Sequence, residues 1–376
     1  MDKFGKLVHY VHHKLGGNYT PISTLDPNEF LSDRLGHHKT PRIVTECAHR
    51  NTINTMAVFR AGMLFSGGKD GLVVLTNTDN GDVHQTWQSR TEINKMCYRN
   101  YVAKHSLVTG GRDGTLSLWV FALNQTCEPA AVFDGHQFGV TGLVNLCDTQ
   151  FMSGSRDCTV KLWDVERSTP VLSETINRNL CTHMSHDANT KMVAQSSEDK
   201  SVRIWDPRNL EVAIEFPRKR HIQMYCEFGG DNRLFSCSNG FNGDGCEITS
   251  YDVRNPRAVR EGRGHEGNVT SLAILHFDAP SRRLLVSVSA DKRIRIWRTE
   301  EEGVNVLKPL WDEEVPLEAD NLQVATYPEG HIIVSGGKGR LIHYHARFVA
   351  QRIILDVLLL QKCRKIAQSA SAHVLR

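Results

Sequence analysis

Residues 153–164, SGSRDCTVKLWD, carry the clearest copy of a pattern that returns along this chain of 376 residues. Similar segments, TGGRDGTLSLW, SSEDKSVRIWD and SVSADKRIRIW, occupy residues 109–119, 196–206 and 287–297. In each of them a tryptophan lies six residues after an aspartate. Weaker copies place the aspartate position at 70, 244 and 339, so the spacing stays between 42 (157 to 199) and 48 (291 to 339) residues. Self-similarity at this period indicates a repeat architecture.

Each copy has the pattern of short strands joined by tight turns. Residues 160–162, 202–204 and 294–296 alternate apolar and polar side chains, which is typical of a half-buried strand. Clusters of Gly, Ser and Asp precede them and favour hairpin turns. A repeat of about 45 residues fits a four-stranded sheet that cannot bury both faces alone. Seven such sheets set radially cover one another, so we predict an all-β, seven-bladed propeller.

The composition narrows the class of protein. Lys plus Arg number 45 and Asp plus Glu 42, a formal charge of +3, which argues against a nucleic-acid binder. The ten cysteines are scattered without a Cys-x-x-Cys pair, as expected for reduced, structural thiols inside the cell. The longest apolar run, residues 357–360, is far shorter than the roughly 20 residues of a membrane helix. No secretion signal is recognisable, so we expect a cytoplasmic protein.

Paired residues in the repeats carry a resemblance to a known family. Gly135-His136 and Gly264-His265 match its Gly-His dipeptide, and Trp163-Asp164 and Trp205-Asp206 match its Trp-Asp dipeptide. On these residues, 42–346 resemble the WD40-repeat family, which implies a seven-bladed WD40 β-propeller. Some copies depart from the family pattern at the tryptophan position, with Thr76, Tyr251 and His345.

We expect two flanking segments around the propeller. Residues 1–41 are expected to form a loosely ordered N-terminal extension, with 42–45 as a strand that the last blade borrows to close the ring. Residues 347–376 form a tail with six basic residues and one acidic residue, Asp356. We expect this tail to begin as a strand and continue as an amphipathic helix. It would dock on the propeller or contact a membrane surface or a partner groove.

The repeats also contain a polar quartet, for which the family resemblance implies a buried, hydrogen-bonded chain. Its members are His136, Ser153, Asp157 and Trp163 in one copy, and His265, Ser287, Asp291 and Trp297 in another. Ser, His and Asp are also the elements of a nucleophilic triad. A catalytic serine is needed once, however, whereas this pattern repeats. We therefore predict a structural role, no catalytic residues and no enzyme activity.

Metal and cofactor sites are not expected. Cys181, His183 and His186, or His343 and His345, could supply ligands, but neither set reaches a complete four-ligand spacing. Residues 336–339, GGKG, lack the remainder of a phosphate-binding loop.

The residue before the repeated aspartate is basic in four of the six copies that we aligned: Lys69, Arg112, Arg156 and Lys338. The family resemblance implies that this turn borders the narrow face of the ring, which is used for ligands. A collar of cations there would attract an acidic or phosphorylated protein segment. The alternative is that each cation pairs with a nearby carboxylate or is simply solvated.

Residues 197–206, 216–217, 221–227 and 236–247 resemble, more specifically, ciliary members of the family. This implies a non-enzymatic protein-interaction scaffold at the cilium or ciliary base. It would regulate intraflagellar transport and BBSome trafficking together with GTPase-activating proteins. The alternative is a substrate receptor of a cullin-4 type ubiquitin ligase, because Trp205-Asp206-x-Arg208 resembles the docking box of such receptors.

Overall fold

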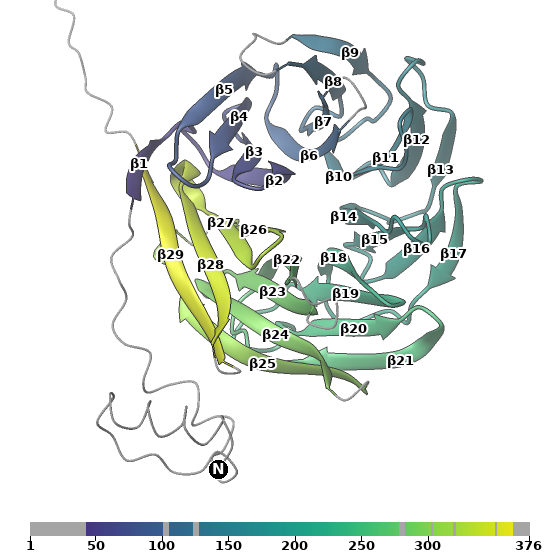
Figure 1. The fold of residues 1–376 in the computed structure, drawn as a ribbon. Helices are drawn as coiled ribbons and strands as arrows, with labels where there is room; N and C mark the ends of the chain where they lie inside the picture. The colour runs from purple at the N-terminus through teal and green to yellow at the C-terminus, as the bar shows by residue number, and fades with distance from the viewer. Residues whose placement is uncertain are drawn as a thin grey trace, which may run out of the picture. The chain divides into compact units, whose positions relative to one another are not determined.

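A computed structural model describes residues 43–100, 105–122, 128–277, 283–301, 304–318, 321–349 and 352–363. Within these ranges the regular structure is β-strand apart from one short 3-10 turn, η2 (Gly337–Gly339). The strands form seven separate sheets set around a central axis, as Figure 1 shows. The predicted all-β, seven-bladed propeller is thus confirmed.

Six blades are four-stranded, and their strands pair in chain order from the axis outward. Blade 1 contains β2 (Ile53–Arg60), β3 (Met63–Gly68), β4 (Leu72–Asn77) and β5 (Val83–Gln88). Blade 2 contains β6 (Ile93–Asn100), β7 (His105–Gly111), β8 (Leu116–Phe121) and β9 (Pro129–Phe133). Blade 3 contains β10 (Val140–Asn145), β11 (Gln150–Ser155), β12 (Thr159–Asp164) and β13 (Leu172–Thr175).

The next three blades repeat this arrangement. Blade 4 contains β14 (Cys181–His186), β15 (Val193–Ser197), β16 (Val202–Asp206) and β17 (Glu211–Glu215). Blade 5 contains β18 (Gln223–Gly230), β19 (Arg233–Ser238), β20 (Ile248–Asp252) and β21 (Asn255–Gly262). Blade 6 contains β22 (Val269–His276), β23 (Arg283–Ser289), β24 (Arg293–Glu301) and β25 (Val304–Glu314).

The turn between the second and third strands explains why the repeated aspartate is followed by a small or flexible residue. That following residue has a positive φ in six blades: Gly71 (72°), Gly114 (91°), Cys158 (68°), Lys200 (72°), Gly245 (76°) and Lys292 (62°). In blade 3 the aspartate also accepts the backbone N–H of Thr159 at 2.9 Å, which fixes the start of β12. The Gly/Ser/Asp cluster in the sequence is therefore this turn.

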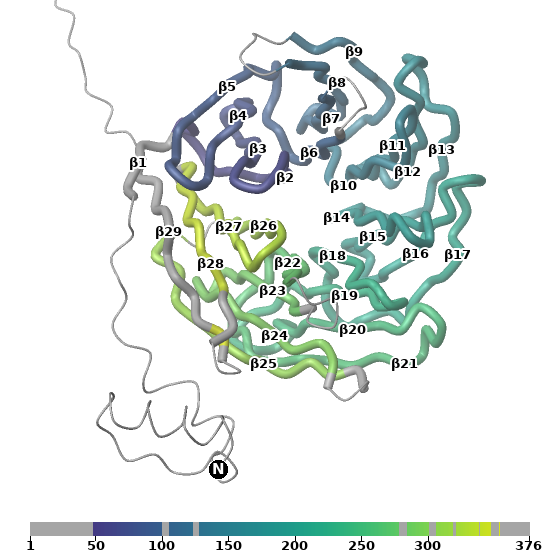
Figure 2. Tube along the Cα trace, in the orientation of Figure 1, coloured from purple at the N-terminus to yellow at the C-terminus, as the bar shows by residue number. Residues whose placement is uncertain are grey.

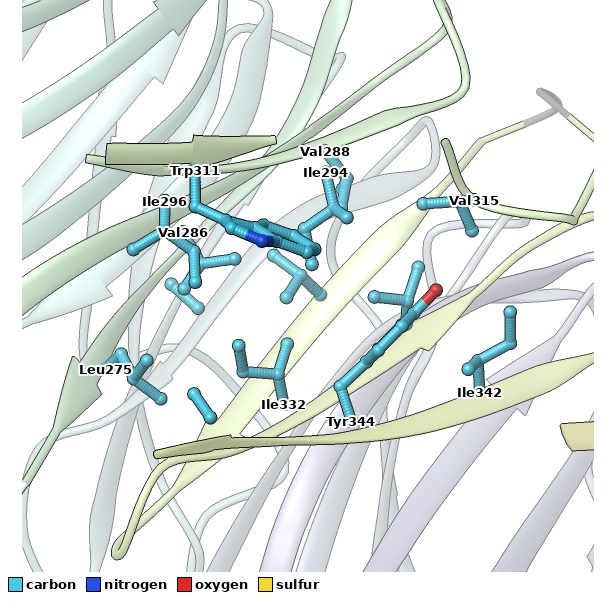
Figure 3. Packing of buried hydrophobic residues seen from close by; sticks show 14 of the residues in the cluster. Leu275, Val286, Val288, Ile294, Ile296, Trp311, Val315, Ile332, Ile342 and Tyr344 are labelled. Atoms are coloured by element: carbon cyan, nitrogen blue, oxygen red, sulfur yellow. The ribbon is translucent and has the colours of Figure 1, made fainter. Parts of the chain in front are cut away.

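Apolar side chains fill the space between neighbouring blades. The described residues contain seven buried clusters, and each one joins two adjacent blades. Between blades 6 and 7, Val286, Ile296 and Trp311 pack against Ile332 and Tyr344 (Figure 3). Each blade thus buries both faces against its neighbours, and the hydrophobic effect drives this burial.

The ring is closed on itself. The innermost strands β2, β6, β10, β14, β18, β22 and β26 each contact the next, and β26 returns to contact β2. Figure 2 traces this path, with the yellow-green β26 and β27 beside the purple strands of blade 1. Between blades 7 and 1, Tyr327 and Ile333 pack with Ile53 and Leu64.

Blade 7 differs from the expectation in how it is completed. It contains β26 (Gln323–Tyr327), β27 (His331–Ser335), β28 (Leu341–Val349) and β29 (Arg352–Cys363), with β1 (Ile43–Cys47) as a fifth strand. β1 does join the last blade. It pairs parallel to β29, with Ile43 opposite Leu359, and is therefore the fifth strand of the sheet and not the fourth. The chain's own β29 fills the place that residues 42–45 were expected to take.

The expected amphipathic helix is wrong for residues 352–363, which form β29. This segment pairs antiparallel to β28, with Phe348 opposite Ile353 and Ile342 opposite Leu360. The free edge of β28 offers backbone donors and acceptors that a helix would leave to solvent. Residues 1–41 and 364–376 lie outside the described residues, as does any membrane or partner contact expected of the end of the tail.

Candidate functional site

The polar quartet of the third repeat lies in blade 3. His136 Nε2 is 2.7 Å from Ser153 Oγ, and Trp163 Nε1 donates to the same oxygen at 2.7 Å. The other ring nitrogen, Nδ1, is 3.0 Å from Asp157 Oδ2. The Asp157 carboxylate can only accept, so Nδ1–H donates to it; Nε2 then accepts the Ser153 hydroxyl hydrogen, while Ser153 Oγ receives the tryptophan hydrogen. The structure thus places all four side chains in one hydrogen-bonded chain.

This geometry braces the blade. Burial by itself raises the pKa of Asp157, but hydrogen bonds from His136, Thr159 and the backbone N–H of Gln137 outweigh it and lower the pKa. Ser153 is 0% exposed, so its hydroxyl is closed to a substrate, whereas a nucleophilic serine must present its oxygen. A fully satisfied buried polar network rigidifies its surroundings.

Blade 6 holds the second predicted quartet with nearly the same distances. His265 lies 2.7 Å from Ser287 and 2.9 Å from Asp291, and Trp297 Nε1 donates to Ser287 Oγ at 2.8 Å. Hydrogen bonds from His265 again outweigh the effect of burial and lower the pKa of Asp291 to about 2.

Blade 1 holds a third arrangement that the sequence analysis missed. His49 Nε2 lies 2.8 Å from Ser66 Oγ, and its Nδ1 lies 3.1 Å from Asp70 Oδ1. Thr76 stands at the position of the tryptophan, and no Gly precedes His49. The signal was the spacing, because His49 and Ser66 are 17 residues apart, as are His136 and Ser153.

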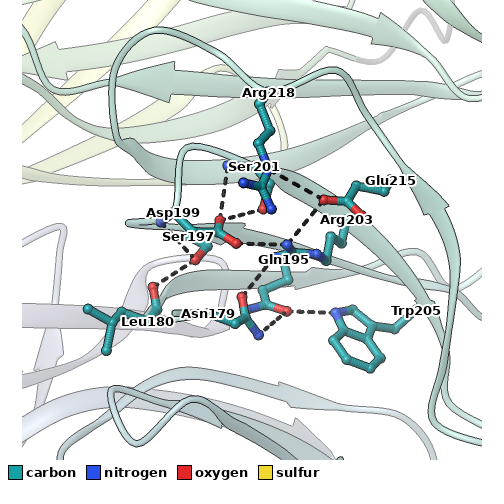
Figure 4. Close-up of polar contacts among 10 residues, drawn as sticks. All are labelled: Asn179, Leu180, Gln195, Ser197, Asp199, Ser201, Arg203, Trp205, Glu215 and Arg218. Carbon is teal, nitrogen blue, oxygen red and sulfur yellow. Dashed lines mark hydrogen bonds and ion pairs between the residues drawn. The ribbon is translucent and has the colours of Figure 1, made fainter. Parts of the chain in front are cut away.

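Blade 4 replaces the quartet by an amide and ion-pair network (Figure 4). Trp205 Nε1 donates to Gln195 Oε1 at 2.6 Å, and Gln195 Nε2 donates to Asn179 Oδ1 at 2.7 Å. The Arg203 guanidinium links this pair to the turn, donating to Asn179 Oδ1 at 2.9 Å and to Asp199 Oδ2 at 2.7 Å. The brace is therefore built from different side chains in different blades.

The residues considered for metal binding have other partners. Among the described residues, no three His, Cys, Asp or Glu side chains are placed to hold a metal ion. His183 stacks on Tyr225, with ring centroids 3.4 Å apart. His343 Nε2 lies 2.8 Å from His331 Nδ1, and its own Nδ1 lies 2.7 Å from the backbone oxygen of Thr78 in blade 1.

A cavity of about 780 Å³ occupies the centre of the ring. The innermost strands of all seven blades contribute to its wall, and the turns that carry Lys69, Arg112 and Arg156 surround its mouth. We call the side of the ring formed by these turns the narrow face. The structure thus brings three of the four predicted cations to one opening, while the side chain of Lys338 lies outside the described residues.

Two of these three cations already have carboxylate partners. Arg112 Nη1 lies 3.0 Å from Glu92 Oε2, and Arg156 Nη2 lies 2.7 Å from Glu198 Oε1. Lys69 is exposed and has no ion pair within the described part of the chain. The mouth therefore combines, among the described residues, two paired cations with one unpaired cation. This result lies between the two alternatives drawn from the sequence, a collar of free cations and a set of cations that are each paired or solvated.

Arg208 belongs to a different surface. It lies in the β16–β17 turn, which a four-stranded antiparallel sheet places at the end opposite the β15–β16 turn of the narrow face. Its side chain is 82% exposed, and its guanidinium is held by Asp206.

The sequence analysis also missed the wall and floor of the cavity. Lys95 on β6 and Tyr225 on β18 come from blades 2 and 5, yet Lys95 Nζ lies 5.1 Å from the centroid of the Tyr225 ring. A β-bulge between Ile93 and Lys95 marks this position, and similar bulges precede His183 and Tyr225. Nothing in the local sequence signals a contact between residues so far apart.

Comparison with known proteins agrees with this geometry. The family model described as WD domain, G-beta repeat matches residues 127–164, 172–206 and 257–298. The WD40 β-propeller domain of Doa1 has a similar structure, with a TM-score of 0.64, 24% identity, and coverage of 82% of this chain and 97% of that chain. A computationally designed protein, Ika8, superposes with a TM-score of 0.59 at 18% identity, over 81% of this chain and all of the design.

Curated relatives share short or partial stretches. Coronin-like protein crn1 of Schizosaccharomyces pombe is 25% identical over 64% of this chain and 35% of its own length. WD repeat-containing protein 37 of Xenopus laevis is 26% identical over 48% of this chain and 36% of its own. E3 ubiquitin-protein ligase COP1 of Pisum sativum is 22% identical over 50% of this chain and 27% of its own length. The chain thus spans about a third of the length of these relatives.

Within the described residues, no helix has the length and apolar character needed to traverse a lipid bilayer.

Proposed function

This chain is a WD40-repeat β-propeller, and we propose that it acts as a non-enzymatic scaffold that binds proteins at its narrow face. The observation that carries the proposal is the central cavity, whose mouth presents Lys69, Arg112 and Arg156 from three successive blades. A rigid ring that offers several turns at once can hold one partner through many weak contacts, or two partners together.

The polar quartets support the non-enzymatic part of the proposal. Their serines are buried and serve as acceptors for tryptophan N–H groups, so they are committed to the fold. The charged groups at the mouth instead favour recognition of an acidic or phosphorylated protein segment, because Lys69 is exposed and makes no ion pair among the residues that the structure describes.

Proximity labelling with a narrow-face variant tests this proposal. Reversing the charge of Lys69, Arg112 and Arg156 to glutamate together should remove a defined set of neighbours that the unmodified chain labels. The matched control reverses Arg254, an exposed arginine of the β20–β21 turn on the opposite side of the ring. Equal labelling by all three proteins would contradict binding at the narrow face.

For the cellular role, we propose the cilium and ciliary base. Residues 236–241, SCSNGF, are similar to WD repeat-containing protein 31, a ciliary member of the family. That similarity supports a role in intraflagellar transport and BBSome trafficking together with GTPase-activating proteins. Cells that lack the chain should then show an altered distribution of transport and BBSome components along cilia. An unchanged distribution would refute this role.

The alternative is a substrate receptor of a cullin-4 type ubiquitin ligase. The exposed guanidinium of Arg208, which is held rigidly by Asp206, supports it, as does the partial similarity to E3 ubiquitin-protein ligase COP1. Arg208→Ala should abolish capture of the ligase adaptor, whereas Arg254→Ala, at the analogous turn of blade 5, serves as the control. Failure of the unmodified chain to capture the adaptor would remove this alternative.

A further inference from the structure

Two side chains that meet across the channel, Lys95 and Tyr225, build the floor of the central cavity. Lys95 reaches from blade 2 to blade 5, where its ammonium lies 5.1 Å from the centroid of the Tyr225 ring. His183 of blade 4 stacks on the Tyr225 ring, and the two ring centroids lie 3.4 Å apart. We call Lys95 and Tyr225 the channel floor.

Most polar groups in the wall of the cavity are already engaged in holding blades together. Asn54 Nδ2 donates to the backbone oxygen of Ile93, and Thr141 Oγ1 donates to that of Cys181. Thr182 and Thr270 make the same kind of bond to the next blade, to Gln223 O and Leu322 O. These side-chain donors are consumed by the ring itself, so they are not available to a ligand.

Lys95 makes no such bond. Within the described residues its ammonium makes neither a hydrogen bond nor an ion pair, and it lies over the face of the Tyr225 ring. Burial lowers the pKa of Lys95 to about 8, and Glu227 is the carboxylate that acts on it through space. Glu227 itself accepts a hydrogen bond from Ser185 Oγ at 3.2 Å. An enclosed cation without a hydrogen-bonded partner is costly, and such groups call for an explanation.

The remaining charges guide an anion toward this floor. Arg112 and Arg156 at the mouth are paired with Glu92 and Glu198, which leaves Lys69 at the mouth and Lys95 at the floor as unpaired cations of the cavity. An entering anion therefore meets positive charge at both ends of its path.

We infer that the channel floor is an anion-binding site that receives a carboxylate or phosphate side chain of a protein segment inserted through the narrow face. The inference rests on the proposed function, since it takes the narrow face as the docking surface and assigns the deepest contact to Lys95. The cavity, at about 780 Å³, has room for a side chain with its flanking backbone.

Peptide arrays test the site directly. Degenerate peptides with a central phosphoserine, glutamate or serine are incubated with the full-length chain, and the strongest binders are measured by fluorescence polarisation. We expect phosphoserine, glutamate or both to bind. Serine should bind at least tenfold more weakly, because the loss of one charge-assisted hydrogen bond lowers affinity by about that factor or more. Equal binding of serine peptides, or no binding to any array, would overturn the inference. A preference between the two acidic arms identifies the anion.

Substitutions then locate the contact. Lys95→Met keeps the length of the side chain and should weaken binding roughly ten- to hundredfold. Lys191→Met is the control, because Lys191 lies in the β14–β15 turn at the opposite end of blade 4 and should leave binding unchanged. Thermal melting shows whether both variants fold.

The inference and the proposed function fail differently. If Lys95→Met binds acidic peptides as well as the unmodified chain, while the charge-reversed mouth loses its labelled neighbours, the floor is excluded and the narrow face stands. If the charge-reversed mouth keeps every neighbour, the proposed function fails as well.

Discussion

Replacing Ser153 by alanine should destabilise the propeller more than the same replacement at Ser66, because the two serines support different numbers of buried partners. Ser153 Oγ receives Trp163 Nε1 and bonds His136 Nε2, so its loss leaves two buried groups unpaired. Each unpaired group costs about 1–3 kcal/mol, so two of them give a loss of about 2–6 kcal/mol. Ser66 bonds His49 alone, and its loss should cost about 1–3 kcal/mol.

Urea unfolding measures this difference. The free energies of unfolding of the unmodified chain and the variants are compared by linear extrapolation, with Ser168→Ala as an exposed control that should change stability by less than about 0.5 kcal/mol. The reasoning is refuted if Ser153→Ala costs no more than Ser66→Ala, or if it is as harmless as Ser168→Ala. Either result would mean that the quartet does not brace the blade.

Three further predictions concern other buried groups. Burial lowers the pKa of His343 to about 4, below its unfolded value, so its contribution of about 3 kcal/mol is complete above pH 6.5 and is lost as the pH falls toward 4. His343→Gln should flatten that part of the stability–pH curve, and an unchanged slope would contradict the assignment. Arg203→Ala leaves Asp199 buried without its cation and should cost about 3–5 kcal/mol in urea unfolding, whereas a loss below about 1 kcal/mol would exclude the blade 4 network as a brace. Lys95→Met removes an unpaired enclosed charge, so its melting temperature should equal or exceed that of the unmodified chain; a clear drop would show that the ammonium stabilises the ring.

The fold could be predicted because its information is local and repeated. Each copy carries its own turn and its own alternating strand, and the aspartate of the turn caps the strand that follows, as Asp157 does for Thr159. Seven copies of one local rule leave few architectures that bury every face.

The last blade could not be predicted in the same way. Residues 352–363 mix apolar and basic side chains in a pattern that fits a helix as well as a strand, and the decision came from the unpaired edge of β28. Likewise, β1 is the fifth strand of this sheet because β29 occupies the fourth position. Both outcomes depend on neighbours that are distant in sequence.

The residues at the mouth of the cavity could be predicted from the sequence, whereas those at its floor could not. Lys69, Arg112 and Arg156 occupy equivalent positions of the repeat, so their convergence follows from the period. The ion pair of Arg112 with Glu92 depends on the directions of two side chains, and the contact of Lys95 with Tyr225 follows a bulge in each strand. The period encodes neither.

Hydrogen–deuterium exchange of the purified chain, with and without a partner found by proximity labelling, tests the central claim most directly. The account predicts slower exchange in the turns at residues 69–71, 112–114 and 156–158 and in the inner strand segment at 93–96 when the partner is bound. Protection confined to the outer strands, with those turns unchanged, would contradict a scaffold that binds through the mouth of its central cavity.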